Sequence, residues 1–462
     1  MAGRKNHRRL CPRKAGVAAE NSAWRRPGAA YTRGMRYTPI DPQLFVENRA
    51  RLHPLLPPRS LAVLNANDIL PTNADGKLGF VQNSDLFYLT GVDQEETILV
   101  LFPDAADEKR REILFLRETS ETIAIWEGHK LTKEEARKRT GIKQVRWLGD
   151  FPAVFRELMC EAERIFLNSN EHKRAADEVQ TRDGRFIRQV REQFPLHELR
   201  RLAPLMHQLR LVKSAFELEL IRKATALTAR GFERVLGFVQ PDVNELEIEA
   251  ELAHEFIRGG GGFAYGPIIA SGPNACVLHY EDNDQPCKKG HLLLLDVASS
   301  YANYRSDLTR TIPVNGRFSK RQRAVYDAVL RVLRASSALC VPGKLPREWQ
   351  KESEQLMEKE LIDLGLLKKS QIRKQDPDRP ALKKYFMHGI GHPIGLDVHD
   401  VGNTNEPMQA GWVLTVEPGI YLKEEGLAVR LENIIVVSDR GPIDLMADIP
   451  IDAEAIEERM RR

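Results

Sequence analysis

Short apolar runs alternate with helical patterns through residues 36–205, and this alternation predicts an α/β domain. Helices are expected over 150–163 and 182–193. The segment 81–91 mixes small polar and aromatic side chains, a pattern that by itself is typical of a loop. Four apolar runs have the length of strands, and they lie at 61–64, 97–102, 112–116 and 164–167.

The second part of the chain follows a different order, in which a pair of helices precedes a group of strands. A Ser-x-x-Glu capping box at Ser214 begins a helix that runs to about Val239. Asn244 begins a second helix, which ends at the four glycines 259–262, and strands follow.

The same order then recurs, with helices expected at about 319–340 and 346–366 and strands over about 382–437. This recurrence indicates a duplicated unit of two helices and a group of strands. We therefore expect an α+β chain of two domains, 36–205 and 206–462, at a usual domain size of about 100–200 residues.

The apolar run 291–296 ends in the carboxylate of Asp296 and is typical of a strand buried on both faces. A polar turn follows, and a return strand begins at Asp307. A hairpin centred between residues 301 and 302 places Asp296 opposite Asp307. Two opposed carboxylates are unfavourable unless one is protonated or a cation lies between them. The alternative is that Asp296 is a turn residue and Asp307 pairs with a neighbouring arginine.

Three histidines, His388, His392 and His399, lie within twelve residues of one another. The first two have the spacing with which ligands share one face of a helix in zinc proteases. Three glycines and Pro393 disfavour a helix here, and no glutamate follows the first histidine. The segment is expected to be extended or looped, so these histidines need not bind the same metal ion.

Two further strands of this half carry charge. Glu417 ends one strand before a Pro-Gly turn, and Arg430 and Glu432 alternate on one face of the strand 429–437. A charge at the end of a strand is usually solvated. Together with the two hairpin aspartates, however, these residues put four carboxylates on strand ends of one domain.

Four carboxylates that share a pocket need positive charge, which a pair of divalent cations would supply. Oxygen ligands with one imidazole suit Mn²⁺, Co²⁺, Fe²⁺ or Zn²⁺ better than Ca²⁺ or Mg²⁺. Two such ions would lower the pKa of a bridging water from ~15.7 toward ~7, which yields a hydroxide suited to amide hydrolysis.

Composition and charge narrow the classes of partner. No apolar run approaches the roughly 18–20 residues that cross a membrane. The formal charge is +4, but residues 1–34 alone carry nine Lys/Arg and one acid, so the remainder has a net charge of −4. The folded part therefore has no basic footprint for nucleic acid.

Cysteine usage and the leader bear on the compartment. Five cysteines at wide spacings, without a CxxC pair, favour a reducing compartment such as the cytoplasm. The basic leader 1–34 lacks the apolar core of a secretory signal. It is expected to be sequence upstream of a start at Met35; a disordered tail or an organellar presequence are the alternatives.

Five motifs of this chain resemble those of the pita-bread metallopeptidases, and most closely aminopeptidase P (Xaa-Pro aminopeptidase). The resemblance covers about residues 40–455 and implies a pita-bread catalytic domain after a smaller N-terminal α/β domain. The motifs are LHY (278–280), the LLLLDVASSY…SDLTRT hairpin, FMHGIGHPIGLDVHD (386–400), LTVEPGIY (414–421) and VRLEN (429–433).

The resemblance implies a ligand set for two divalent metal ions, of which Mn²⁺ is expected first and Co²⁺, Zn²⁺ or Fe²⁺ are alternatives. Asp296 would bind one ion, and His392 and Glu417 would bind the other. Asp307 and Glu432 would bridge both.

The resemblance also implies roles in catalysis and substrate binding. Glu417 matches the carboxylate that shuttles a proton. His279, His388 and His399 match histidines that bind substrate and stabilise the tetrahedral intermediate. The residues that would support the site are Tyr421, Arg430 and the interdomain Arg210.

Two N-terminal segments, 82–91 and 125–128, are similar to the N-terminal domain of aminopeptidase P. In that family the positions of Asp85 and Trp126 approach the active site of a neighbouring subunit. The resemblance therefore implies a homodimer or homotetramer in which these residues contribute to substrate binding.

We expect a dinuclear-metal aminopeptidase that hydrolyses the N-terminal Xaa-Pro bond by attack of a metal-bridging hydroxide. The bond before proline is a tertiary amide without an N–H, so peptidases that bind that hydrogen fail on it. The alternatives are a prolidase, which cleaves only Xaa-Pro dipeptides, and a non-catalytic binding protein with the same fold.

Overall fold

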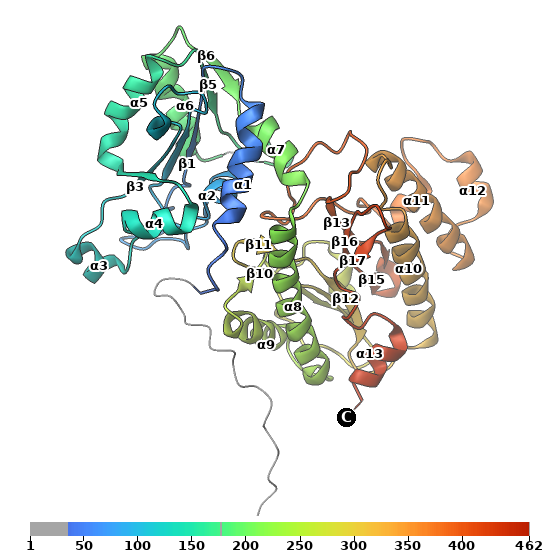
Figure 1. Ribbon diagram of the computed structural model, residues 1–462. Coiled ribbons are helices and arrows are strands. Elements are labelled where there is room, and N and C mark those ends of the chain that lie inside the picture. Colours follow the sequence, from blue (N-terminus) through green and yellow to red (C-terminus); the bar gives the residue numbers. More distant parts are fainter. Residues whose placement is uncertain (1–35, 176–177, 462) are drawn as a thin grey trace, which may run out of the picture.

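A computed structural model describes residues 36–175 and 178–461 and arranges them in two lobes (Figure 1). The leader expected at residues 1–34 lies outside the described residues. Helix α7 (Ala203–Leu211) lies between the lobes and spans the position where the domain boundary is expected. The exact boundary stays a prediction, whereas the α+β organisation is observed.

The N-terminal lobe is built on one six-stranded sheet with the order β4-β3-β2-β1-β5-β6. Strands β1, β2 and β3 pair antiparallel, and the other neighbours pair parallel. The strands are β1 (Ser60–Asn65), β2 (Ile98–Leu101), β3 (Glu112–Leu116), β4 (Gln144–Trp147), β5 (Arg164–Leu167) and β6 (Glu198–Arg201).

Helices cover both faces of this sheet, and alternate residues of β1 show it. Leu61 and Val63 belong to one core cluster, and Ala62 and Leu64 belong to another. Because both faces are buried, the strands read as continuous apolar runs. The helices of this lobe are α1 (Gln43–Leu52), α2 (Ser84–Thr90), α3 (Glu121–Glu127), α4 (Lys133–Thr140), α5 (Phe151–Met159) and α6 (Arg182–Gln193).

The four apolar runs form the strands that were expected, and α6 has the expected bounds. Strands β4 and β6, at the two edges of the sheet, are too polar to be found by hydrophobicity. Helix α5 is shorter than the expected 150–163. The segment 81–91 is not a loop: Asn83 accepts hydrogen bonds from the backbone of Asp85 and Leu86 and so begins α2.

The C-terminal lobe has the expected alternation of helix pairs and strands. Its helices are α8 (Ala215–Phe238), α9 (Glu245–Arg258), α10 (Lys320–Ala338), α11 (Pro346–Asp363), α12 (Lys369–Lys374) and α13 (Ala453–Arg459). Its strands are β7 (Gly262–Phe263), β8 (Ile268–Ser271), β9 (Leu292–Asp296), β10 (Ser299–Tyr301), β11 (Tyr304–Arg305), β12 (Thr309–Pro313), β13 (Val413–Val416), β14 (Gly419–Leu422), β15 (Leu427–Arg430), β16 (Asn433–Val436) and β17 (Ile443–Asp444).

Two three-stranded groups, β12-β9-β8 and β13-β16-β17, lie at the centre of this lobe, and the two helix pairs flank them (Figure 1). The strand expected to end in Asp296 is β9, at the middle of its group. Segment 388–400 holds neither helix nor ladder strand, as its glycines and proline indicate.

The register of the central hairpin differs from the expected one. Tyr301 pairs with Tyr304, and the two turn residues between them have positive φ, as a two-residue hairpin of type I′ requires. The turn is therefore centred one residue later than expected, and Asp296 pairs with Thr309 rather than with Asp307. Asp307 lies two residues from Thr309 and so becomes the diagonal neighbour of Asp296 on the same face.

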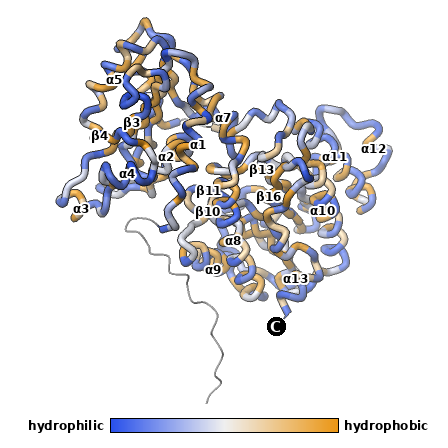
Figure 2. Tube along the Cα trace, in the orientation of Figure 1, coloured by the Kyte–Doolittle hydropathy of each residue, from blue (hydrophilic) through white to orange (hydrophobic). Residues whose placement is uncertain are grey.

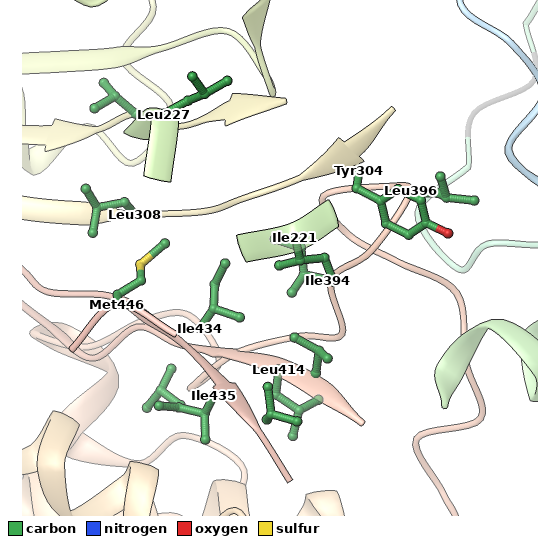
Figure 3. Packing of buried hydrophobic residues seen from close by; sticks show 14 of the residues in the cluster. Ile221, Leu227, Tyr304, Leu308, Ile394, Leu396, Leu414, Ile434, Ile435 and Met446 are labelled. Carbon is green, nitrogen blue, oxygen red and sulfur yellow. The ribbon is translucent and has the colours of Figure 1, made fainter. Parts of the chain in front are cut away.

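The core of the C-terminal lobe lies between α8 and the strands. Ile221 and Leu227 on α8 face Leu308, Leu414 and Ile434 of the sheet region (Figure 3). Hydrophobic residues gather along the strands inside each lobe (Figure 2). Among the described residues, no helix combines the length and the apolar composition that a bilayer span requires.

Candidate metal centre

The two hairpin aspartates lie side by side, although they are not a directly opposed pair. The hydroxyl of Tyr265 is 2.6 Å from Oδ1 of Asp296 and 2.6 Å from Oδ1 of Asp307. Asp296 ends the central strand β9, and Asp307 precedes β12 in its own group of strands. The hairpin thus delivers two carboxylates to one point, which a shared hydroxyl marks.

Glu432 joins them from the adjacent strands. Thr309 donates its hydroxyl to Oε2 of Glu432 at 2.8 Å, and the Glu432 backbone N–H bonds the Thr309 carbonyl. Arg430 donates from Nη2 to Oδ2 of Asp296 at 2.6 Å. The strand that alternates arginine and glutamate therefore brings both charges to the two aspartates.

His392 presents a lone pair to this group. Its Nδ1 is 3.0 Å from the carbonyl oxygen of Pro393, which can only accept, so the Nδ1 carries the proton. In a neutral ring Nε2 is then unprotonated, and it lies 3.6 Å from Oδ2 of Asp307 and 3.8 Å from Oε1 of Glu417. A lone pair that faces two carboxylates is repelled unless a cation lies between them.

Burial makes the uncompensated negative charge of these carboxylates more unfavourable. Burial, and then repulsion from Asp296, raises the pKa of Asp307 well above its usual range. Burial, and then repulsion from Asp307, does the same to the pKa of Glu432. Burial raises the pKa of Glu417 to about 7, although Arg430 opposes the rise. Burial, reinforced by His399, lowers the pKa of His392 to about 3.

The histidines around the centre have different partners. His388 donates from Nδ1 to the Gly389 carbonyl at 2.8 Å, and its Nε2 is 2.9 Å from the hydroxyl of Tyr421. Tyr421 in turn accepts from Nη1 of Arg430 at 2.9 Å. Arg430, Tyr421 and His388 therefore form a chain of hydrogen bonds behind the carboxylates. Burial, followed by Arg430, lowers the pKa of His388 to about 4.

His399 stands edge-to-face against His392, with ring centroids 4.3 Å apart. Its ring nitrogens are 2.9 and 3.2 Å from Nη1 of Arg174, a residue of the N-terminal lobe. Because a guanidinium only donates, His399 accepts from it and is neutral. Burial, followed by Arg174, lowers the pKa of His399 to about 4.

One cavity of about 580 Å³ collects these side chains, a size within the range of about 300–1,000 Å³ typical of ligand sites. The floor of the cavity is almost fully buried, because Asp307 is 4% exposed and Glu432 is 2% exposed. His279, Glu281 and Arg174 are exposed and mark its open side. The acidic residues that line it are Glu281, Asp296, Asp307, Glu417 and Glu432.

The donor set fits divalent cations. Among the described residues that line the cavity, five are acidic and two, Arg174 and Arg430, are arginines. Arg430 is already bonded to Asp296. Ligand atoms of Asp307, His392 and Glu432 lie within 4.8 Å of one another, close enough to hold one metal ion. Buried carboxylates, an unprotonated imidazole nitrogen and too few protein cations to balance the charge are together typical of a metal site.

Comparisons with known proteins agree with this chemistry. The family described as Metallopeptidase family M24 matches residues 219–439, and that described as Aminopeptidase P, N-terminal domain, matches residues 45–166. Xaa-Pro aminopeptidase of Haemophilus influenzae is 32% identical over 432 residues, 90% of this chain and 96% of that protein. The chain belongs to metallopeptidase family M24.

Other relatives support the same assignment. Human Xaa-Pro aminopeptidase 3 is 31% identical over 82% of this chain and 76% of its own length. Zn-substituted Escherichia coli aminopeptidase P in complex with product has a TM-score of 0.82 at 31% identity, and the match covers 92% of this chain and all of that one. Pseudomonas aeruginosa aminopeptidase PepP also has a TM-score of 0.82, at 32% identity.

This M24 chain therefore has the two-domain aminopeptidase P fold, with a pita-bread domain after the N-terminal domain. It is a hydrolase and a metallo-aminopeptidase, and family membership implies divalent metal ions. The expected fold, family and enzyme class are confirmed.

Two of the expected substrate-binding residues lie in a second cluster between the lobes of the M24 chain, which we name the latch cluster. It comprises Asp85, Arg210, Lys213, Asp397 and Asp400. Arg210 donates to Asp85 at 2.8 Å, to Asp397 at 2.6 Å and to Asp400 at 2.5 Å. Lys213 donates to Asp400 at 2.8 Å. Arg210 and Asp85 therefore connect the lobes and line a neighbouring cavity of about 440 Å³.

Trp126 lies elsewhere. It is on α3, far along the N-terminal lobe, and it is 83% exposed beside Ile125, which is 80% exposed (Figure 1). Neither residue lines the cavity of the metal centre. Within one copy of the M24 chain, the structure brings together the five expected metal ligands and the three histidines but not this tryptophan.

Sequence reasoning missed three residues that the M24 site uses. Tyr265 follows the four glycines in a segment without a charged neighbour, and Thr309 lay hidden in the expected return strand. Arg174 belongs to the other lobe, in a polar stretch with no periodicity. The Arg-x-Asp-x-Thr spacing of residues 305–309 could have indicated Thr309, whereas no local signal pointed to Arg174 or Tyr265.

Proposed function

We propose that this enzyme removes the N-terminal residue from peptides whose second residue is proline. The observation that carries the proposal is the convergence of four carboxylates and an imidazole lone pair on one buried point of an aminopeptidase P fold. The relatives that match most of the chain are named Xaa-Pro aminopeptidases.

The ligands of two divalent cations would be Asp296, Asp307, His392, Glu417 and Glu432. Bound there, such cations polarise a carbonyl group and make water a stronger nucleophile. Because the set combines carboxylates with one imidazole, we propose Mn²⁺ as the physiological ion, with Co²⁺, Zn²⁺ and Fe²⁺ as alternatives.

The acidic floor orients the substrate. A free α-ammonium group is attracted to the carboxylates at the floor, and this attraction restricts cleavage to the first residue of a peptide. The proline nitrogen of the scissile bond is a poor leaving group and must be protonated as the bond breaks. Glu417, which lines the cavity beside His388 and His392, is the candidate to take a proton from the attacking water and pass it to that nitrogen.

Hydrogen-bond donors around the floor hold the reacting groups in place. Arg430 fixes Asp296 and Tyr421, and Tyr421 fixes the ring of His388. His279 and His399, on the more open side, are the candidates to bind the carbonyl oxygen on which negative charge develops. Of these residues, Tyr421 acts through His388 as a positioning residue, whereas His388 itself lines the cavity and is a further candidate to bind substrate.

A test separates this function from that of a prolidase, the alternative that the named relatives do not favour. Enzyme stripped with EDTA is reconstituted with Mn²⁺, Co²⁺ or Zn²⁺ and given Ala-Pro-Ala and Ala-Pro. We expect metal-dependent cleavage of the tripeptide. Cleavage of the dipeptide alone would make the enzyme a prolidase. If the metal-loaded enzyme cleaves neither peptide, the proposed specificity is overturned.

We further propose a homodimer or homotetramer in the cytoplasm. Exposed Ile125 and Trp126 on α3 offer an apolar surface to a second subunit, where Trp126 would approach the neighbouring site. The described cysteines, Cys160, Cys276, Cys287 and Cys340, are all free thiols. Sedimentation velocity of Trp126→Ala tests the assembly, because a smaller species is expected than for the unmodified protein.

A further inference from the structure

Arg174 reaches the catalytic cavity from the other lobe. It lies in the segment between β5 and α6 of the N-terminal lobe, yet it lines the cavity of the metal centre together with Asp296 and Glu417. Its Nη1 donates to His399, which stands against the ligand His392. A strong cation is thus held 2.9 Å from a ring that touches the metal centre.

The position of Arg174 in the cavity is at the open side. Asp307 and Glu432 at the floor are almost fully buried, whereas Arg174 is exposed. Arg174 and His399 also line the neighbouring cavity of about 440 Å³, so the two cavities meet at this pair. A peptide whose amino end lies at the acidic floor must extend toward this side, because a tripeptide or longer chain needs an exit.

The guanidinium has donors to spare. Among the described residues, its side-chain hydrogen bonds run from Nη1 alone, and no carboxylate forms an ion pair with it. The other arginine of the cavity, Arg430, is fully engaged with Asp296, Tyr421 and Thr309. Arg174 is therefore the cation on the exit side that can take a new anionic partner, and its planar fork matches a carboxylate.

We propose that Arg174 is a substrate-binding residue that takes a carboxylate of the peptide beyond the proline. The inference rests on the proposed Xaa-Pro specificity. The carboxylate comes either from the free C-terminus of a short peptide or from an acidic side chain at the third residue. Binding of this carboxylate by Arg174 would make the enzyme prefer short or acidic peptides. The N-terminal lobe, which carries Arg174, would set this preference.

The experiment compares matched peptides on metal-loaded enzyme. Ala-Pro-Ala is set against Ala-Pro-Ala-NH₂, and Ala-Pro-Glu-NH₂ against Ala-Pro-Gln-NH₂. A charge-assisted hydrogen bond predicts a kcat/KM about 10- to 100-fold higher for the carboxylate member, expressed mainly in KM. Discrimination in the first pair identifies the C-terminal carboxylate as the source, and discrimination in the second identifies the side chain.

Variants then assign the effect to Arg174. In Arg174→Gln the ratio between carboxylate and amide substrates is expected to fall to about one, and Arg174→Lys is expected to keep part of it. The control is Lys173→Gln, which removes the same charge from the residue directly before Arg174. Lys173 is exposed and lines neither cavity. This control is expected to keep the full ratio.

Two outcomes would overturn the inference. One is a wild-type enzyme that does not discriminate in either pair. The other is an equal loss for carboxylate and amide substrates in Arg174→Gln, which would mean that Arg174 acts only through His399. Both outcomes leave the Xaa-Pro activity standing, because the amides are still cleaved. If metal-loaded wild type cleaves none of the four peptides, the proposed function fails as well.

Discussion

Two groups of buried and partly buried carboxylates lie close together in this molecule and differ in how their charge is balanced. The latch cluster sets three aspartates against Arg210 and Lys213. The metal centre sets four carboxylates against Arg430, with Arg174 at its rim. Burial would raise the pKa of Asp400 in the latch, but Arg210 and Lys213 outweigh it and hold that pKa below its usual range. At the metal centre burial prevails, and the pKa of Asp307 rises.

This difference in charge balance distinguishes carboxylates with a structural role from those of the functional site. A buried carboxylate whose charge the protein itself balances joins two parts of the fold, as Asp400 joins 397–400 to the interdomain arginine. A buried carboxylate left without a protein cation lowers stability until something else supplies the charge. The imbalance, rather than the number of acidic residues, identifies the functional site.

The largest expected effect comes from removing a proposed ligand of the metal centre. Asp307→Asn should lower kcat/KM for Ala-Pro-Ala by about 10³-fold or more, because one donor to the reacting centre is lost. Metal content by mass spectrometry and steady-state kinetics measure it. Asp439→Asn, an exposed carboxylate on the same lobe, should change neither. Full metal content with full activity in Asp307→Asn would contradict the assignment.

Breaking the latch cluster should affect stability first. Arg210→Met leaves Asp85, Asp397 and Asp400 with Lys213 as the remaining cation of the cluster, and loss of one partner of a buried ion pair costs about 3–5 kcal/mol. Urea unfolding measures the loss. Arg200→Met removes an arginine from an exposed pair with Glu198 and should cost less than about 0.5 kcal/mol. Equal losses of stability in the two variants would mean that the latch cluster stabilises the fold no more than an exposed ion pair does.

When metal is removed, replacing an aspartate by asparagine should change the stability of the protein in opposite directions at the metal centre and in the latch cluster. In EDTA, Asp307→Asn should be more stable than wild type by about 1 kcal/mol, because the buried wild-type carboxyl group must either carry a repelled charge or take up a proton. At a metal concentration of about 100 times Kd, wild type should gain about 2.7 kcal/mol and the variant less. Thermal unfolding with and without Mn²⁺ checks the reversal. A variant less stable than wild type in EDTA would show that the carboxylates are not in excess.

The last expected effect is a pH dependence of the latch cluster. The pKa of Asp400 is lower in the folded protein than in the unfolded chain, where it is about 3.9. Its stabilising contribution is therefore present above about pH 4 and is lost as the pH falls through the folded value. Asp400→Asn keeps a hydrogen-bond acceptor and should cost roughly 1–3 kcal/mol at pH 7 and less at pH 3. Urea unfolding at the two pH values tests this, and an unchanged difference would argue against the charged latch.

Much of the local structure was determined by the sequence itself. Strand β9 is a run of leucines, α8 begins at a Ser-x-x-Glu capping box, and α6 repeats apolar residues on one face. Each of these signals acts over a few residues, where side-chain periodicity and backbone hydrogen bonding decide the conformation. The four carboxylates of the proposed ligand set were also predictable from their positions at expected strand ends, whereas only the family resemblance selected His392 among the three histidines.

The tertiary structure decided what local patterns do not contain. The hairpin turn forms at Ala302 and Asn303 and shifts Asp296 opposite Thr309, because register depends on turn geometry and on how the whole strand packs. Tyr265 and Arg174 come to the metal centre from segments with no signal of their own. The latch joins residues up to 190 positions apart. Coulomb interactions depend on distance in space and on burial. Only the folded chain could therefore show which carboxylates have their charge balanced by Arg or Lys side chains and which need a bound cation.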